Sequence, residues 1–271
     1  MTPIEIVQEA LKEDLPNGDL TIDSLGLTEH KGRAKLVARE DLILSGQEFF
    51  SIAINLLNQE NQIQWQFNDG DWILKNQTVA TISGNLISLL KTERVGLSFL
   101  GHFSGIATFT YCFVRQTEGF QCKILDTYET LPLLKQWEKK AVRDGGVRNH
   151  PLNLSSTLLI RENHIRLTDG LPKAVEQIRT QTNKPIEVEC HTLEEVETAT
   201  RLSVQRVLLN GMDNETIKLA MEKIPTHIKV IVSGNMSIER IPSIAELGVH
   251  YISVGAITHS APRADFSLLF E

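Results

Sequence analysis

The chain has 271 residues, of which 41% are hydrophobic and 23% are charged, and its 27 basic and 34 acidic side chains leave a formal net charge of −7. A chain of this size can bury a proper core as one large domain or two modest ones. No stretch approaches the roughly 18 uninterrupted apolar residues of a membrane helix, so we expect no membrane partner. An acidic chain without a basic run is also a poor candidate for binding nucleic acid.

The N-terminal residues and the cysteines both predict a cytoplasmic protein. The start of the chain carries acidic side chains, and it has neither the basic region nor the apolar core of a secretory signal. Cys112, Cys122 and Cys190 are odd in number and lack CxxC spacing, which is typical of free thiols in a reducing compartment. A cytoplasmic enzyme is the class that these features favour.

The first hundred residues mix helical and strand patterns. Apolar residues at helical spacing predict a helix over Pro3–Leu15. Partial alternation predicts strands over Lys31–Arg39 and Val79–Ser83, and a long apolar face predicts a helix from Ile87 to about Gly101. This part of the chain therefore has an α+β pattern.

The second half of the chain has a regular rhythm of apolar runs and amphipathic stretches. The runs, which we expect to be strands, are Lys123–Leu125, Thr157–Ile160, Ile186–Cys190, Arg206–Leu209, Ile228–Val232 and Tyr251–Val254. The amphipathic stretches between the last four are Thr192–Leu202, Asn214–Lys223 and Ser237–Leu247. Strands at this βα spacing predict a parallel sheet covered by helices, either a β/α barrel or an open doubly wound sheet. The absence of GxGxxG after the first such strand disfavours a dinucleotide-binding fold.

Polar residues follow each expected strand, where a barrel would bring them together at its carboxyl end. These residues are Asp126 to Glu129, Arg161 to His164, Glu187, Glu189, Asn210, Ser233 to Asn235 and Gly255 to Ser260. The small residues after the last two strands are typical of loops that bind phosphate through backbone N–H groups, although they also occur in ordinary turns.

Glu187 and Glu189 alternate on one expected strand, so their side chains point to the same face. Two acids that face a barrel interior are costly unless they bind a metal ion or pair with cations. From the residues alone, a metal site and a pairing with a lysine at the barrel rim both stay open. The chain has no HExxH, GxSxG, P-loop or Cys/His zinc spacing, so hydrolase and zinc functions have little support.

Blocks of residues along essentially the whole chain form a specific combination. They are Ala10–Leu15, Gly18–Thr21, Thr92–Arg94, Ser104–Thr108, Leu125–Thr127, Glu138–Lys139, Ala141–Arg143, Gly145–Gly146, Asn149–His150, Glu187–Glu189, Ile252–Ala256 and Thr258–Pro262. In these blocks the chain resembles the quinolinate phosphoribosyltransferase family, also called carboxylating nicotinate-nucleotide pyrophosphorylases.

The resemblance implies an α/β protein with an N-terminal α/β sandwich domain and a C-terminal incomplete parallel β/α barrel. We place the first domain at residues 1–106, with residues 262–271 expected to pack back on it, and the barrel at residues 107–261. Family members are homodimers in which the N-terminal domain of one subunit helps close the barrel site of the other. They transfer ribose 5-phosphate from phosphoribosyl pyrophosphate to quinolinate, a pyridine dicarboxylate, with Mg²⁺, and they release pyrophosphate and CO₂.

Position by position, the resemblance assigns Glu189 and Arg161 to catalysis, and Glu189 and Glu162 to the metal ion. Arg94 would reach across the dimer to the carboxylates of the base, and His150 would line the same pocket. The expected substrate-binding residues are Arg94, Tyr128, Glu129, His150, Arg161, Asn210, Ser233, Gly234, Asn235, Gly255 and His259.

Several of these positions depart from the family pattern. Tyr128 and Glu129 stand where the family has arginine and lysine, and Pro151 stands where it has another arginine. Asn210 replaces an aspartate on the metal side, while the Arg161-Glu162 pair replaces lysine and aspartate with the charge signs kept. Together these changes remove about three positive charges from a site that binds anions through charged hydrogen bonds.

Two functions therefore remain open. The first is phosphoribosyl transfer to quinolinate or to a related base with less negative charge. The alternative is a divergent paralogue that keeps the fold and the phosphate loops, and that has a different, less anionic ligand or a non-catalytic binding or regulatory role.

Overall fold

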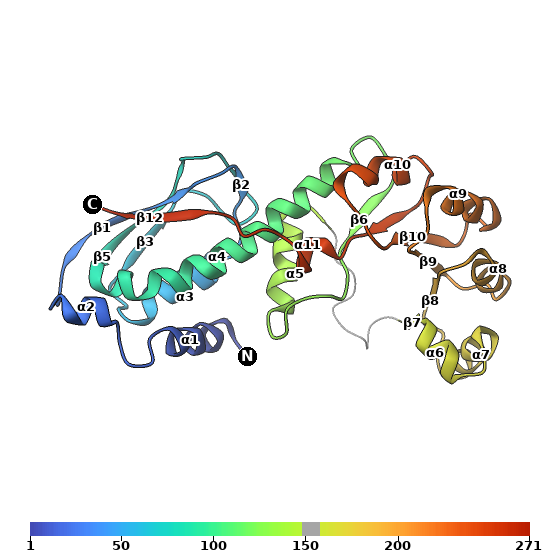
Figure 1. Cartoon of the computed structure of the whole chain (residues 1–271), viewed down its shortest axis with the longest axis horizontal. Coiled ribbons are helices and arrows are strands. Elements are labelled where there is room, and N and C mark those ends of the chain that lie inside the picture. Colours follow the sequence, from blue (N-terminus) through green and yellow to red (C-terminus); the bar gives the residue numbers. More distant parts are fainter. Residues whose placement is uncertain (148–157) are drawn as a thin grey trace. The chain divides into compact units, whose positions relative to one another are not determined.

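The computed structural model describes residues 1–147 and 158–271, and the chain divides into two compact units (Figure 1). The sheet unit comprises Met1–Tyr111, Leu131–Gly146 and Ala261–Glu271, and the barrel unit comprises Cys112–Thr130 and Val147–Ser260. Each unit is therefore assembled from segments that lie far apart in the sequence.

An antiparallel four-stranded sheet forms one layer of the sheet unit. Its order is β12 (Phe266–Phe270), β1 (Lys31–Ala38), β5 (Thr78–Asn85) and β3 (Gln62–Trp65). The C-terminal strand β12 pairs with β1, with Leu268 opposite Leu36. The remaining elements are α1 (Pro3–Asp14), α2 (Leu20–Ser24), β2 (Leu42–Ile43), α3 (Gln47–Leu56), β4 (Trp72–Ile73), α4 (Leu86–Arg115) and α5 (Lys135–Asp144).

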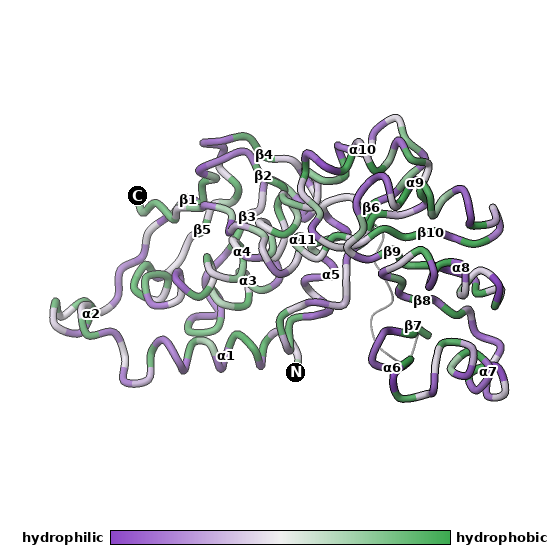
Figure 2. The backbone as a smooth tube through the Cα atoms, turned by 45° about the vertical axis from the view of Figure 1, so that its right-hand side comes forward, coloured by the Kyte–Doolittle hydropathy of each residue, from purple (hydrophilic) through white to green (hydrophobic). Residues whose placement is uncertain are grey.

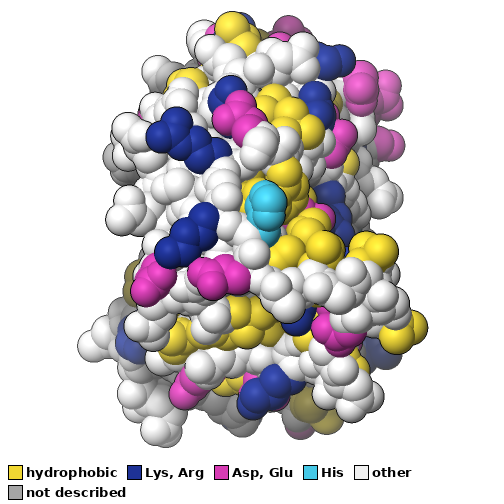
Figure 3. Space-filling model, turned by 90° about the vertical axis from the view of Figure 1, so that its left-hand side faces the viewer, with side chains coloured by type: hydrophobic (Ala, Val, Ile, Leu, Met, Phe, Trp, Pro, Cys, Tyr) yellow, Lys and Arg dark blue, Asp and Glu magenta, His cyan; other side chains and the backbone are white. Residues whose placement is uncertain are grey.

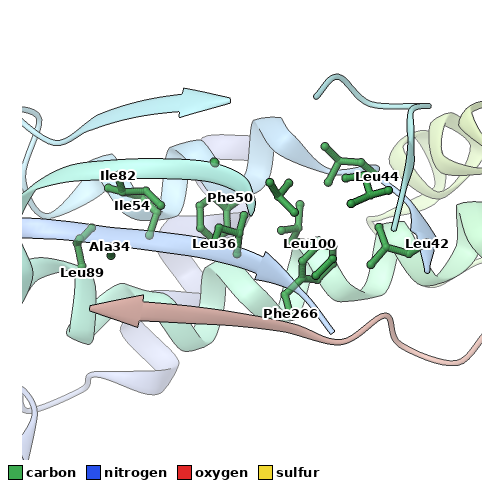
Figure 4. Packing of buried hydrophobic residues seen from close by; sticks show 14 of the residues in the cluster. Ala34, Leu36, Leu42, Leu44, Phe50, Ile54, Ile82, Leu89, Leu100 and Phe266 are labelled. Carbon is green, nitrogen blue, oxygen red and sulfur yellow. The ribbon is translucent and has the colours of Figure 1, made fainter. Parts of the chain in front are cut away.

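The core of the sheet unit lies between this sheet and the helices α3 and α4. Leu36 and Ile82 of the sheet are fully buried, as are Phe50 of α3 and Leu89 and Leu100 of α4, and Figure 4 shows these side chains pointing toward one another. Burial of such large apolar side chains is the main source of stability in a unit of this size.

Helix α4 is longer than the sequence predicts, because two glycines do not end it. It continues past Gly101 and Gly105 to Arg115. A Cβ atom on Gly105 would lie 2.0 Å from the carbonyl oxygen of Pro262, and one on Gly101 would lie 2.7 Å from that of Ala264. These glycines therefore permit close passage of the C-terminal segment, and they do not mark a helix end.

By length and composition alone, one helix of the described residues could cross a membrane. This helix is α4, and half of its most apolar window is buried within the protein. Leu89 and Leu100 lie in the core described above, which is the arrangement of a core helix.

The described residues of the barrel unit contain six parallel strands, as the sequence predicts. They are β6 (Lys123–Leu125), β7 (Leu158–Ile160), β8 (Ile186–Cys190), β9 (Arg206–Asn210), β10 (Lys229–Ser233) and β11 (Tyr251–Ser253). They pair in the order β6-β11-β10-β9-β8-β7, so the first strand in sequence adjoins the last. A barrel requires this order, and among the described residues no ladder joins β6 to β7, which leaves it open there.

Helices cover the outer side of these strands (Figure 1). They are α6 (Glu162–Leu167), α7 (Leu171–Gln181), α8 (Leu193–Arg201), α9 (Asn214–Lys223), η1 (Ile238–Arg240), α10 (Ile241–Ala245) and α11 (Ala256–His259). Figure 2 shows β10 as mostly hydrophobic and α8 as alternating between hydrophilic and hydrophobic. Strands buried on both faces and helices with one polar face give this pattern.

Candidate active site

A cavity of about 450 Å³ lies at the carboxyl ends of the barrel strands. All six strands or the loops that follow them contribute to its lining, as expected for this kind of fold. The lining residues are Thr127, Tyr128, Glu129, Leu159, Arg161, Glu187, Glu189, Leu208, Asn210, Ser233 to Met236, Ser253 to Ala256 and His259. The barrel therefore brings together thirteen of the residues that the sequence analysis singles out at strand ends. They are Thr127 to Glu129, Arg161, Glu187, Glu189, Asn210, Ser233 to Asn235, Gly255, Ala256 and His259.

Strand β8 presents two acids to this cavity. Glu187 and Glu189 alternate on the strand, and both line the cavity. Glu189 Oε1 accepts a hydrogen bond from Asn210 Nδ2 at 2.6 Å, and it lies 3.3 Å from His191 Nε2. Asn210 thus holds the orientation of Glu189 from the neighbouring strand β9.

Glu187 is buried more deeply than Glu189, and its carboxylate oxygens have fewer hydrogen bonds. Its side chain is 2% exposed, and Oε2 has no hydrogen-bond partner among the described residues. Arg206 Nη1, on the strand position paired with Glu187, lies 3.7 Å from this oxygen. The sequence left open a lysine at the barrel rim as the partner of one acid. Among the ion pairs of the described residues, the partner of Glu187 is instead this arginine at the start of β9.

Burial raises the pKa of the Glu187 carboxyl above its ordinary value. The charge of Arg206 lowers this pKa in part, and the charge of Glu189 raises it. When folding raises the pKa of an acid, its protonated form contributes to stability. This contribution is fully present below the pKa that the group has in the unfolded chain, and it is lost as pH rises through the pKa that it has in the folded protein. Ionised Glu187 therefore destabilises the protein at neutral pH.

We expect the Glu187→Gln variant to unfold at a higher temperature than wild type at pH 8, by about 3 °C. The gain should shrink toward zero as pH falls below the ordinary pKa of glutamate, because the wild-type carboxyl is then neutral too. Thermal unfolding between pH 4 and pH 8, in buffer free of divalent cations, measures this difference. A difference that does not change with pH would contradict the assignment.

The loops after β9 and β10 pack against each other at backbone distance. Gly211 N donates a hydrogen bond to Ser233 O at 3.0 Å. Gly234 has a φ of +94°, and a Cβ atom on it would lie 2.7 Å from Gly211 N. Asn235 follows in the left-handed region with a φ of 48°, which asparagine tolerates better than most residues. The main chain at 233–235 therefore has one tightly defined path along the cavity wall.

Two side chains cover the glycine that follows β11. A Cβ atom on Gly255 would lie 2.8 Å from Glu129 Oε2 and 3.0 Å from His259 Nε2. These two side chains are neighbours, with 3.7 Å between His259 Nε2 and Glu129 Oε2. Thr258 Oγ1 donates to Glu129 O and fixes the β6 loop above the loop after β11. Glu129 therefore places a negative charge beside Gly255.

The cavity lining has few cations for a site that would bind phosphate. Among the described lining residues, Arg161 is the one lysine or arginine, against the acids Glu129, Glu187 and Glu189. Arg161 lies at the start of α6, where its backbone N–H donates to His164 Nδ1 at 3.1 Å. His164 thus caps a helix and is absent from the lining of this cavity.

Two of the predicted site residues lie elsewhere, and the position of a third is not described. Glu162 is an exposed residue of α6, it pairs with Arg166, and it does not line the cavity. Arg94 belongs to the sheet unit, where its side chain is 81% exposed and lies 3.9 Å from Asp14 Oδ1. His150, together with Pro151, lies outside the described residues. The roles predicted for these residues remain predictions.

Two family profiles match almost the whole chain. The C-terminal domain of quinolinate phosphoribosyl transferase matches residues 106–269, and the N-terminal domain matches residues 19–104. The chain belongs to the quinolinate phosphoribosyltransferase family. The prediction from the sequence blocks, which span both matched regions, is thereby confirmed.

Individual relatives of this family agree with the profiles. A probable carboxylating nicotinate-nucleotide pyrophosphorylase of Synechocystis is 34% identical over 97% of this chain and 90% of its own length. Its counterpart from Bacillus subtilis is 33% identical over 94% and 89%. The solved nicotinate-nucleotide pyrophosphorylase of Ehrlichia chaffeensis covers 100% of this chain and 99% of its own, with 34% identity and a TM-score of 0.95. That of Francisella tularensis covers 99% and 96%, with 36% identity and a TM-score of 0.92.

The phosphoribosyltransferase cavity also depends on two residues that the sequence analysis missed. Arg206 is the ion-pair partner of Glu187 among the described residues, and Arg240 contacts both loops that carry Asn210 to Met212 and Ser233 to Asn235. Arg206 could have been found by pairing neighbouring strands in register, since parallel strands place it beside Glu187. Arg240 follows a loop, and no periodic pattern marks it.

Proposed function

We propose that this protein transfers ribose 5-phosphate from phosphoribosyl pyrophosphate to the ring nitrogen of quinolinate. The products are nicotinate mononucleotide, pyrophosphate and CO₂. The observation that carries this proposal is the cavity at the barrel end, where a pair of acids on β8 faces glycine loops of β10 and β11, in a chain of this family. The comparisons give no support to a non-catalytic paralogue.

The two sides of the cavity suit the two ends of phosphoribosyl pyrophosphate. The loops at 233–235 and 255–256 have small residues and no acid of their own, so their backbone can approach the 5-phosphate. The acids of β8 suit the end where pyrophosphate leaves, because positive charge develops on the ribose there as the C1–oxygen bond breaks. Glu189, oriented by Asn210, is placed to stabilise that charge. The ring nitrogen then forms the new bond to C1, and loss of the adjacent carboxylate as CO₂ leaves a carbanion that takes up a proton.

Mg²⁺ is part of this proposal. The buried Glu187 Oε2 has no hydrogen-bond partner among the described residues, and Glu189 lies on the same face of the strand. No group of three or more His, Cys, Asp or Glu ligands occurs in the described part of the chain. This donor set fits Mg²⁺ held by one or two carboxylates together with substrate phosphates. When bound, the ion would neutralise the departing pyrophosphate.

A homodimer with a shared site also belongs to the proposal, because the described lining supplies one arginine for two anionic substrates. Arg94 of the partner subunit would add a cation for the carboxylates of the base. Around Arg94, a hollow in the sheet unit is lined by both apolar and charged side chains, and two of the apolar ones, Leu20 and Leu25, are 82% and 66% exposed. An exposed apolar patch with a polar rim is typical of an interface, and Figure 3 shows apolar side chains among charged ones on one face. We also place the protein in the cytoplasm, which agrees with its three free cysteines.

Growth of a bacterium that lacks its own quinolinate phosphoribosyltransferase tests this function. Expression of the wild-type chain should restore growth without nicotinate, and expression of Glu189→Gln at the same level should not. Failure of the abundant, folded wild-type protein to restore growth would contradict the proposal.

A further inference from the structure

Arg240 connects the two loops that form one wall of the cavity. It is the last residue of η1, and its Nη2 donates to Met212 O at 2.6 Å in the loop after β9. Its Nη1 donates to Gly234 O at 3.3 Å in the loop after β10. The planar guanidinium group can serve both carbonyls at once, which a lysine ammonium cannot do in the same fixed geometry.

The guanidinium group is itself held in place. Nη2 also contacts Asn214 Oδ1 at 3.4 Å, and Asn214 Nδ2 donates to Ser243 Oγ at 2.9 Å. Ser243 Oγ in turn donates to the carbonyl oxygen of Arg240 at 2.8 Å. Arg240 is half-buried and does not line the cavity. Its contacts are therefore with the protein, behind the cavity wall.

These two loops are in contact with each other and form one wall of the cavity. Gly211 and Gly234 are in direct backbone contact, so a shift of one loop moves the other. Asn210, the residue before Gly211, holds Glu189 Oε1 at 2.6 Å. On the other side, the backbone after Ser233 is the part of the wall that would meet a phosphate group.

We propose that Arg240 is a positioning residue that holds the loops after β9 and β10 together and so presets the backbone at 233–235 for the 5-phosphate of phosphoribosyl pyrophosphate. This inference rests on the proposed function. Because backbone contacts to this phosphate are the same before and during the reaction, their loss should raise KM for phosphoribosyl pyrophosphate and change kcat little.

The test compares Arg240→Met with Arg179→Met. Arg179 provides a matched control, because its Nη2 also donates to two backbone carbonyls, those of Leu202 and Ser203, and it lines no part of the cavity. We expect Arg240→Met to raise KM for phosphoribosyl pyrophosphate about tenfold, with kcat within about twofold of wild type. KM for quinolinate should not change, and Arg179→Met should leave all three constants at wild-type values.

Calorimetry with ribose 5-phosphate separates this inference from the proposed function, since it needs no reaction. Wild type should bind this ligand, and Arg240→Met should bind it about tenfold more weakly. If wild type binds ribose 5-phosphate but makes no nucleotide, the proposed function fails while the role of Arg240 is still measured. Three results would overturn the inference. Arg240→Met could bind ribose 5-phosphate as tightly as wild type, both methionine variants could lose the same affinity, or wild type could fail to bind this ligand.

A conservative variant covers the case in which Arg240→Met does not fold. Arg240→Lys keeps the positive charge and can reach one of the two carbonyls. Its KM for phosphoribosyl pyrophosphate and its dissociation constant for ribose 5-phosphate should rise, with its Tm close to that of wild type. Wild-type values for Arg240→Lys, in a sample where Arg240→Met is unfolded, would show that the arginine serves stability alone.

Discussion

Replacing Glu189 with glutamine is expected to lower kcat for quinolinate phosphoribosyl transfer by about a hundredfold or more. Glutamine keeps the size of the side chain and an oxygen that Asn210 Nδ2 can still reach. It removes the negative charge that, in the proposed function, stabilises the positive charge on the ribose. Steady-state kinetics with saturating phosphoribosyl pyrophosphate and quinolinate measure the effect. Tm should remain within about 2 °C of wild type.

Glu194→Gln is the control for this variant. Glu194 lies in the first turn of α8, is exposed, and does not line the cavity, so the same chemical change should leave kcat unaltered. A Glu189→Gln enzyme with more than a tenth of wild-type kcat would show that Glu189 does not stabilise the transition state as we propose.

Mixing two inactive variants tests the proposed homodimer with a shared site. Arg94→Ala lacks the cation given to the partner subunit, and Glu189→Gln lacks the acid of its own barrel. In a mixed dimer the barrel with intact Glu189 receives Arg94 from the partner subunit, so one of the two sites is complete. Complete exchange of subunits should restore about a quarter of wild-type activity per subunit. Activity no greater than the sum of the two variants would contradict a shared site.

Restoring the family residues at two positions is expected to strengthen quinolinate binding. The double variant Tyr128→Arg, Glu129→Lys adds three positive charges to a lining that has one arginine and three glutamates in its described part. Each charged hydrogen bond to a carboxylate contributes about 1.5–3 kcal/mol, so KM for quinolinate should fall at least about tenfold. Glu129→Lys also removes the acid that lies near His259 beside Gly255.

A charge reversal away from the cavity controls for the change in net charge. Glu176 is exposed on α7, where it pairs with Lys173 at 3.2 Å, and it does not line the cavity. Glu176→Lys should leave KM for quinolinate at its wild-type value. If quinolinate were used by the double variant and not at all by wild type, the natural acceptor would be a different base.

The elements that could be predicted are those whose sequence pattern is local. Strand β8 and helix α9 begin and end where the sequence predicts, because a β-branched run and an amphipathic stretch with Asp213 as its N-cap define them. Helix α5 was missed because most of its residues are polar or charged. Its Glu138 and Lys139 are fully buried, and Glu138 Oε1 lies 2.8 Å from His102 Nε2. The buried face of α5 has three apolar residues, Trp137, Ala141 and Val142, and these give too short an apolar pattern to stand out in the sequence.

In the candidate site, too, the features that could be predicted are those that follow from local sequence patterns. That residues after successive strands meet at one end follows from the barrel pattern, and this predicted Glu189, Asn210 and the loop at Ser233. Contacts between side chains that lie far apart in the sequence do not follow from the barrel pattern. The contact of Glu129 with His259, which joins the first barrel strand to the last, depends on how the barrel closes, and the bond from Arg240 to Met212 depends on the path of two loops.

The nucleotide made by the wild-type protein is the most direct test of the account. Purified protein with Mg²⁺, phosphoribosyl pyrophosphate and quinolinate should yield nicotinate mononucleotide, pyrophosphate and CO₂ in equal amounts, identified by mass spectrometry and quantified over time. Nicotinate in place of quinolinate should give no CO₂. A wild-type protein that binds phosphoribosyl pyrophosphate and forms no nucleotide with quinolinate would contradict the central claim.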